Sequence, residues 1–223
     1  MNSIADTRQI DTATRILDAA EALFVEHGFE ATSMRMITQR AEVNLAAVNY
    51  HFGSKDALFQ GVFTRRLTPL TQAALLNIDR LEAAAGAKAL GVNVIMTAFM
   101  DAALAVANDP ARGGPIFVRL LSRTFVETHP ALREVLARYN EEWVQRYSHA
   151  LGQALPMLDA HELQWRLNFA FSTIFHAFAG NNILRLFMND AGINARDPRL
   201  IATYLVPFVV AGLTAPPTPK GAD

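Results

Sequence analysis

The residues with the clearest potential for chemistry lie between positions 33 and 55, on what the periodicity predicts as two short helices. Val48 and Phe52, spaced i and i+4, give the second helix an apolar side that faces inward. The outer side then carries Ala46, Ala47, Asn49, Tyr50 and His51. Small side chains let a helix backbone approach base edges and touch a thymine methyl group. This face is therefore suited to the major groove of DNA.

Basic side chains flank this segment. Lys55 follows Ser54 at the start of the next predicted helix, where backbone amides and an ammonium group converge on an anion such as phosphate. Arg35, in the first turn of the preceding helix, can reach a base edge or a phosphate. Residues 31–66 hold five Lys or Arg against two acidic side chains, in a chain of net charge −1. We therefore expect a local positive patch there.

Each of these residues also has a simpler structural interpretation. The Tyr50 ring can cover the preceding helix while only its hydroxyl points outward. His51 can cap or bridge helices, and Arg40 is better explained as a solvated surface charge than as a DNA contact. The segment as a unit is a stronger signal than any of its members.

Residues typical of helix ends predict the helices that position these side chains. The first starts after Asp11 or Thr12, carries an apolar stripe from Ile16 to Phe24 and ends at Gly28. Each later helix has a polar residue before it, and the cap candidates are Thr32 or Ser33, Asn44 and Ser54. The second and third helices form a helix-turn-helix, and the fourth is expected to continue past residue 66.

Helical periodicity also dominates the rest of the chain, which is predicted to be all-α. Gly and Pro breaks delimit helices near 67–85, 88–107, 115–128, 130–154, 160–188 and 198–213. We expect an N-terminal helix-turn-helix domain over 1–66, joined to a larger helical bundle over 67–214. Residues 215–223, with three prolines, are expected to form a flexible tail.

Composition bounds the class of protein. The 223 residues are 51% hydrophobic and 18% charged, too apolar for a disordered chain, and the low charge suggests surface hidden in a subunit interface or an apolar cavity. Cys is absent, which excludes disulfides and thiolate sites and fits a reducing compartment. No stretch reaches the roughly 18 apolar residues of a membrane span, and no secretion signal is visible. A cytoplasmic protein with no membrane partner is expected.

Enzymatic alternatives are weak. His161 and Glu162 begin like a zinc-protease helix, but Trp165 stands where the second histidine must be. The six His are not spaced at i+3 or i+4, and no nucleophile turn, phosphate loop or dinucleotide motif is present. We expect no enzyme, no metal and no cofactor. A helical dimerisation protein with a vestigial helix-turn-helix remains as the alternative class.

Residues 10–63 resemble the DNA-binding module of the TetR family of bacterial transcriptional regulators. The resemblance rests on Ile16 to Phe24 with Gly28-Phe29, and on Asn44 to Lys55, which match the family's first helix and its recognition helix. It implies phosphate contacts from Ser33 and Lys55, base contacts from Arg35 and Ala47, and positions along the DNA backbone for Tyr50 and His51. The partner is then double-stranded operator DNA.

Two residues depart from the family pattern. Asn49 replaces the more usual aromatic, which favours adenine readout at this position. Glu42 stands where a turn glycine is common, and it costs about 1 kcal/mol if the turn needs positive φ.

The family resemblance also implies a dimer and an effector. In regulators of this family the last two helices form a four-helix interface between two subunits, and here these helices would be 162–188 and 198–213. The predicted interface residues are Phe169, Phe175, Leu205, Phe208 and Val209. The residues predicted to line an effector cavity are Phe117, Leu121, Phe125, Trp143, Phe171 and Phe178. Arg119 or His176 would meet a polar head group. The simpler interpretations are a surface charge ladder for Arg119 and a satisfied core histidine for His176.

The nature of the effector is predicted from a further resemblance. Ile116 to Leu121 and Thr128 to Leu136, with the recognition segment, look like a branch of the family that responds to long-chain fatty acids or their coenzyme A thioesters. Repression relieved by such a hydrophobic molecule is the expected function. Aromatic side chains also suit flat molecules, so a multidrug-type or other hydrophobic-metabolite sensor is the alternative.

Overall fold

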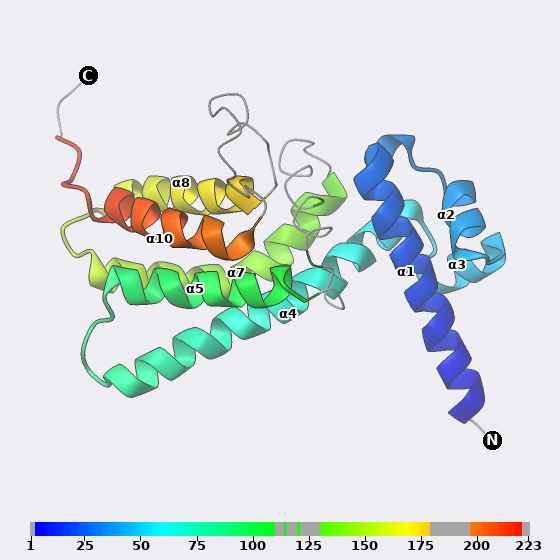
Figure 1. Cartoon of the computed structure of the whole chain (residues 1–223), viewed down its shortest axis with the longest axis horizontal. Helices are drawn as coiled ribbons and strands as arrows, with labels where there is room; N and C mark the ends of the chain where they lie inside the picture. The colour runs from blue at the N-terminus through cyan, green and yellow to red at the C-terminus, as the bar shows by residue number, and fades with distance from the viewer. Residues whose placement is uncertain (1–2, 110–113, 115–119, 121–129, 179–196, 220–223) are drawn as a thin grey trace.

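The structure is a computed structural model that describes residues 3–109, 114, 120, 130–178 and 197–219. Within these ranges the regular elements are all α-helices (Figure 1). They are α1 (Ser3–Ala31), α2 (Met34–Ala41), α3 (Leu45–Phe52), α4 (Lys55–Ala85), α5 (Val92–Ala107), α7 (Pro130–Ala154), α8 (Ala160–Phe178) and α10 (Pro198–Thr214). The predicted all-α class is confirmed. The predicted helix over 115–128 lies almost wholly outside the described residues, as does the end of the one over 160–188.

The short helices start where the sequence predicted. Ser33, Asn44 and Ser54 each accept a hydrogen bond from the backbone N–H three residues further on, at 3.2, 2.8 and 3.0 Å. These bonds satisfy amides that a helix start otherwise leaves open. Thr32, the other cap candidate, is buried, and its hydroxyl donates to the carbonyl of Gly28 at 2.7 Å.

The first helix differs from its prediction at one end. It starts at Ser3 and not after Asp11 or Thr12, because residues 3–10 contain no Gly or Pro that would break it. Gly28 does interrupt the helix, with φ 83° and ψ 173°, and the helix resumes to Ala31. A glycine adopts this backbone conformation without a steric penalty.

The helices α1, α2 and α3 pack with the first turns of α4 around one apolar core. Its largest fully buried members are Phe24, Phe59, Phe63, Ile16, Ile37 and Leu58. The rings of Phe24 and Phe59 meet edge to face with centroids 5.1 Å apart. This core fixes α3 against the rest of the N-terminal module, with Val48 fully buried and Phe52 partly buried.

One long helix joins this module to the bundle. As predicted, α4 continues past residue 66, and it ends at Ala85. Figure 1 shows α4 running from the N-terminal module along the bundle, with α5 and α7 packed against it and α8 and α10 beyond α5. No helix in the described part of the chain is long and apolar enough to cross a membrane.

Candidate nucleic-acid interface

The turn between α2 and α3 sets the angle of the candidate recognition helix. Glu42 ends α2 in the left-handed region, with φ 54° and ψ 46°, so the condition for a backbone cost at this turn is met. A guanidinium nitrogen of Arg15, from α1, donates to the carbonyls of Ala41 and Glu42, the latter at 2.9 Å. The first helix therefore holds the end of α2 and with it the start of α3.

The outward face of α3 matches the prediction in most positions. Ala46 and Asn49 are exposed, and 74% of Tyr50 is exposed, so Tyr50 is not a core residue. Ala47 and His51 are partly buried. The rings of Tyr50 and His51 meet edge to face at 5.2 Å, which gives this edge of the helix a joined aromatic surface.

The residues that flank α3 have structural contacts of their own. Ser33 caps α2, but a hydroxyl that accepts one bond still has a proton to donate. Arg35 is exposed. The Lys55 ammonium lies 4.2 Å from the centre of the Phe29 ring and 3.4 Å from the carbonyl of Glu30, so Lys55 also fastens the end of α1.

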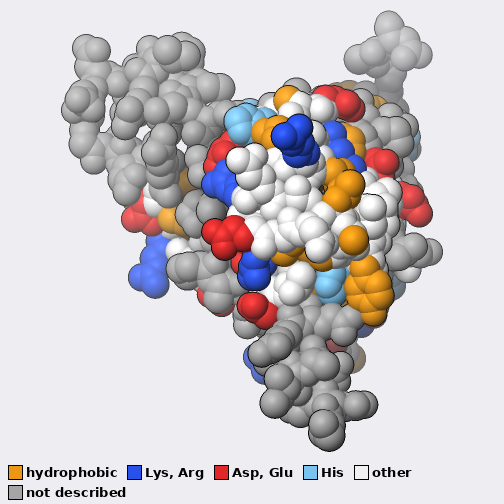
Figure 2. Space-filling model, turned by 90° about the vertical axis from the view of Figure 1, so that its right-hand side faces the viewer, with side chains coloured by type: hydrophobic (Ala, Val, Ile, Leu, Met, Phe, Trp, Pro, Cys, Tyr) orange, Lys and Arg blue, Asp and Glu red, His pale blue; other side chains and the backbone are white. Residues whose placement is uncertain are grey.

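The expected positive patch is largely neutralised. Three of the five basic side chains between residues 31 and 66 pair with acids of α1. The pairs, each at 2.6 or 2.7 Å, are Arg65–Asp18, Arg65–Glu21, Arg66–Glu21 and Arg40–Glu26. The hydrogen bond from Arg40 lowers the pKa of Glu26. Figure 2 looks at this end of the molecule and shows Lys and Arg interspersed with Asp and Glu.

Only part of the predicted effector site lies within the described residues. Phe117, Arg119, Leu121 and Phe125 lie outside the described residues. Trp143 is buried on α7, and Phe171 on α8 meets it edge to face with centroids 5.3 Å apart. Phe178 is partly buried and His176 is exposed, so His176 is not a core histidine.

Two further aromatic residues that the sequence analysis missed complete this cluster. Phe99 of α5 stacks on Trp143 at 5.3 Å with an interplanar angle of 18°. Tyr147, one helical turn after Trp143, is fully buried and donates its hydroxyl to the carbonyl of Ala74 in α4 at 3.0 Å. The i, i+4 spacing of Trp143 and Tyr147 was a signal for the second. A signal for Phe99 was the polar row of Asn93, Thr97 and Asp101 at i, i+4 and i+8, which places Phe99 on the other, buried side of α5.

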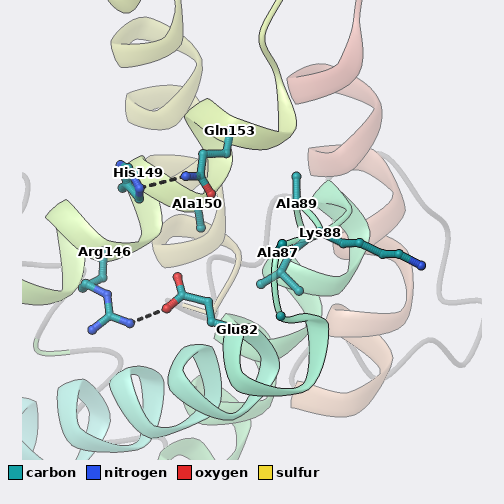
Figure 3. A pocket seen from close by; sticks show the side chains of 10 residues that line it. Glu82, Ala87, Lys88, Ala89, Arg146, His149, Ala150 and Gln153 are labelled. Carbon is teal, nitrogen blue, oxygen red and sulfur yellow. Dashed lines mark hydrogen bonds and ion pairs between the residues drawn. The ribbon is translucent and has the colours of Figure 1, made fainter.

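A pocket lies at the far end of α4, away from the predicted effector site (Figure 3). It encloses about 630 Å³ between α4, α7 and the connection over residues 86–90. At one side Arg146 donates to Glu82 at 2.6 Å, and at another the His149 ring lies 3.0 Å from the Gln153 amide. Charged groups of Glu82, Lys88 and Arg146 line it together with Ala and Leu side chains, whereas the predicted effector site is formed mainly by aromatic side chains. Sequence reasoning missed it because its walls are more than 50 residues apart along the chain.

Large aromatic side chains are exposed on α8 and on α10. Trp165 and Phe169 lie one turn apart on α8, and Tyr204 and Phe208 lie one turn apart on α10; each is between 52% and 73% exposed. Two other residues of the predicted interface set, Leu205 and Val209, are only 8% and 4% exposed in the single chain. Both belong to the core of the single chain, because each lies about 100° around α10 from the exposed residue before it. The side chain of Phe175 lies outside the description.

The start of the expected flexible tail is tied to α8. Arg166 donates to the carbonyls of Ala215 at 2.6 Å and Pro216 at 2.7 Å. The Glu162 carboxylate accepts from the backbone N–H of Thr218 at 2.9 Å, and this bond, with Arg166, lowers the pKa of Glu162. Residues 215–218 thus have contacts that the expectation of a frayed tail did not include.

Comparison with known proteins agrees with a helix-turn-helix DNA-binding regulator. Residues 16–62 match the model described as bacterial regulatory proteins, tetR family, and residues 97–212 match the tetracyclin repressor-like C-terminal domain. The HTH-type transcriptional repressor Rv3405c of Mycobacterium tuberculosis is 31% identical over 199 residues, which cover 86% of this chain and 93% of that protein. The chain belongs to the TetR family of bacterial regulatory proteins, and it is a transcriptional regulator of the helix-turn-helix type, not an enzyme.

Other similarities are narrower. The regulator UidR of Escherichia coli is 41% identical over 51 residues, which cover 23% of this chain and 26% of UidR. The structure of SmeT, the repressor of the Stenotrophomonas maltophilia multidrug efflux pump SmeDEF, superposes with a TM-score of 0.59 at 19% identity, covering 94% of this chain and all of that one. The second similarity concerns the fold. Groups of three or more potential metal ligands were not found among the described residues.

Proposed function

We propose that the chain represses transcription as a homodimer whose two α3 helices enter successive major grooves of a pseudo-palindromic operator. The observation that carries the proposal is the outward face of α3, on which Ala46 and Asn49 are exposed. Small residues suit close approach to base edges, and the Asn49 amide suits the two-bond contact with adenine. Arg35, Ala47 and Tyr50 border this face and extend it toward neighbouring bases and phosphates.

The remaining residues predicted to bind DNA are proposed to contact its phosphate backbone. Ser33 keeps a hydroxyl proton for a phosphate oxygen, and His51 lies at the edge of α3 beside Tyr50. Lys55 stands at the N-terminus of α4, where the helix dipole and the ammonium group attract the same anion. Because three other cations of this module are paired with acids, these contacts carry most of the attraction to DNA.

A gel shift tests the DNA-binding function. The probe is the DNA that flanks the chain's own coding region, and a random duplex of equal length is the control. We expect stoichiometric binding to the flanking DNA that weakens steeply with salt, because phosphate contacts release counterions. Equal binding to both duplexes, or none, would favour the helical dimerisation protein as the better description.

The dimer is proposed to form through the exposed face of α8 and α10. Large apolar side chains rarely gather on a surface that stays in water. On α8 the exposed rings of Trp165 and Phe169 lie 5.6 Å apart, and the adjacent α10 carries the exposed Tyr204 and Phe208. Two copies related by a twofold axis would bury each other's aromatic rings and form a four-helix interface.

We further infer that the effector is a hydrophobic small molecule, with a long-chain fatty acid or acyl-CoA as the leading candidate. Trp143 and Phe171 lie together between α7 and α8, and the residues predicted to extend this surface come from 115–128. Each buried methylene of an acyl chain contributes about 0.8 kcal/mol. The aromatic side chains near Trp143 equally suit contact with a flat aromatic molecule, which supports a multidrug-type sensor as the second candidate.

Native mass spectrometry of protein purified without added ligand separates these candidates. A co-purified fatty acid, with affinity that increases over a series of acyl chain lengths, would support the lipid effector. Tight binding of planar aromatic compounds and no dependence on chain length would support the second candidate. In either case, addition of the effector is expected to release the operator in the gel shift.

A further inference from the structure

The segment that follows α10 returns to α8, where two largely buried charged side chains hold it. The Arg166 and Glu162 side chains are 12% and 16% exposed, and Arg166 Nη2 donates to Glu162 at 2.6 Å. Arg166 Nη1 donates to the carbonyl of Leu213, in the last turn of α10, at 2.9 Å and to that of Ala215 at 2.6 Å. Nη2 also donates to the carbonyl of Pro216 at 2.7 Å. Because a guanidinium group has five N–H donors in one plane, this one arginine joins α8, the end of α10 and the residues after it.

The Glu162 carboxylate completes the attachment. One of its oxygens accepts hydrogen bonds from the backbone N–H of Thr218 at 2.9 Å and from the Thr218 hydroxyl at 3.0 Å. These bonds, together with Arg166, lower the pKa of Glu162, so the carboxylate is ionised near neutral pH. Residues 215–218, which we call the strap, are therefore held at both ends.

The composition of the strap favours an ordered conformation. Pro216 and Pro217 have a fixed φ and no N–H that would need a hydrogen-bond partner. Proline also reduces the conformational entropy of the unfolded chain, so less entropy is lost when the strap binds to α8. A segment this short can therefore stay in place with few contacts.

The strap joins two helices at the ends that the chain does not connect directly. The sequence links the end of α8 to the start of α10 through residues 179–197, whereas the strap ties the start of α8 to the end of α10. Among the described helices, α10 is the main packing partner of α8, and Figure 1 shows the two side by side. Both helices carry exposed aromatic side chains, so the placement of α8 on α10 decides whether those rings lie on one surface.

We propose that the strap fastens α8 to α10, and that the surface through which two copies associate depends on this attachment. Without the strap, the Arg166–Glu162 pair would be exposed to water, and an exposed ion pair contributes little to stability. The start of α8 would then move more freely relative to α10. The effect on dimerisation rests on the proposed function, whereas the attachment itself is a property of one chain.

Two truncated chains test the effect on dimerisation. A chain that ends at Thr214 lacks the strap, and a chain that ends at Pro219 keeps it and is the matched control. We expect the dimer dissociation constant, measured by sedimentation equilibrium, to rise about tenfold without the strap, because a loosened surface must be ordered when it binds. The control should dimerise as the full chain does. Equal dissociation constants for the two truncated chains would overturn the role of the strap in dimerisation.

Thr218→Pro tests the same attachment in a chain of full length. The substitution removes the N–H and the hydroxyl that bind Glu162 but leaves the buried ion pair in place. We expect weaker dimerisation, in the same direction as for the chain without the strap. Thr214→Val, which removes a hydroxyl that bonds within α10, is the control and should have no effect. An unchanged dimer for Thr218→Pro, or equal weakening by both substitutions, would contradict the proposal.

Hydrogen exchange separates failure of the attachment from failure of the proposed dimer. It is compared in Phe208→Glu chains with and without residues 215–223, because this substitution is expected to give a monomer. The amides of 164–170 and 209–213 should exchange faster without the strap, and those of α1 should not change. Equal protection of α8 and α10 in both chains would overturn the attachment. If the wild-type chain is itself monomeric, the proposed dimer fails and this comparison still tests the attachment.

Discussion

Asn49 and Lys55 lie six positions apart but are expected to act on DNA in different ways. Asn49→Ala should weaken operator binding by about 1–3 kcal/mol and relax the preference at one base position, because the Asn49 amide is proposed to hydrogen-bond to a base edge. Lys55→Ala should weaken binding to all duplexes and reduce the salt slope by about 1. Gel shifts on operator and random DNA over a salt series measure both.

The control for these variants is Lys88→Ala, which removes an exposed charge at the far end of the molecule and should change neither quantity. If Asn49→Ala loses the same affinity for operator and random DNA, Asn49 does not recognise a base. Since Lys55 also fastens the end of α1, unfolding must be measured for Lys55→Ala in parallel.

Glu42 is held in a backbone conformation that favours glycine. Left-handed φ and ψ cost a non-glycine residue of order 1 kcal/mol, and the carbonyl that Arg15 binds is retained in any variant. Glu42→Gly should therefore raise the free energy of unfolding by about 1 kcal/mol, measured by urea denaturation. Gln39→Gly, at an exposed position inside α2, should lower it by about the same amount. A Glu42→Gly chain no more stable than wild type would mean that the turn carries no strain.

Single side chains were predictable from the sequence where their partners are local. Ser33, Asn44 and Ser54 cap helices three residues away, so their roles follow from spacing alone. The partners of Arg65 and Arg66 lie more than 40 residues earlier in the chain, and both were counted as part of a positive patch that the fold neutralises. Composition does not reveal a pair that only tertiary packing creates.

The contact between α4 and α7 gives a prediction about pH. Burial raises the pKa of Tyr147 in the folded chain, whereas an unfolded tyrosine has a pKa near 10. The stability that depends on the protonated hydroxyl is therefore complete below about pH 10 and is lost as the pH rises above it. Tyr147→Phe should cost about 1 kcal/mol near pH 7, through the lost bond to Ala74.

Tyr147→Phe should also flatten the decline of stability above about pH 10, because its ring has no proton to lose. Urea unfolding near pH 7 and near pH 10.5 measures both effects. Tyr50→Phe is the matched control. Tyr50 is 74% exposed, so loss of its hydroxyl should change neither the stability near pH 7 nor the decline of stability at high pH. A parallel decline for wild type and Tyr147→Phe would contradict the assignment.

Helices were predicted better than the faces they present. Gly, Pro and cap residues located most ends within a few positions, whereas the start of α1 was missed because residues 3–10 carry no breaker. On α10 the apolar residues surround the helix, so periodicity could not separate Leu205 and Val209, which face the core, from Phe208, which faces outward. That distinction depends on how α5 and α8 pack against the helix.

Among the described residues, α8 and α10 carry four exposed aromatic side chains, and these determine the last prediction. Phe208 is 69% exposed on α10, so Phe208→Glu should fold normally yet place a charge in the interface of the proposed dimer. We expect a folded monomer in sedimentation velocity at micromolar concentration, with loss of operator binding because a single α3 reads only a half-site.

Two further variants make this test specific to the surface of α8 and α10. Leu76→Glu, at a 49% exposed leucine of α4, introduces the same charge elsewhere and should leave the dimer intact. Val209→Glu, at a neighbouring but 4% exposed residue, should instead unfold the chain because the charge enters the core. If Phe208→Glu remains dimeric while Leu76→Glu dissociates, the subunits meet along α4 and the aromatic face of α8 and α10 serves another partner.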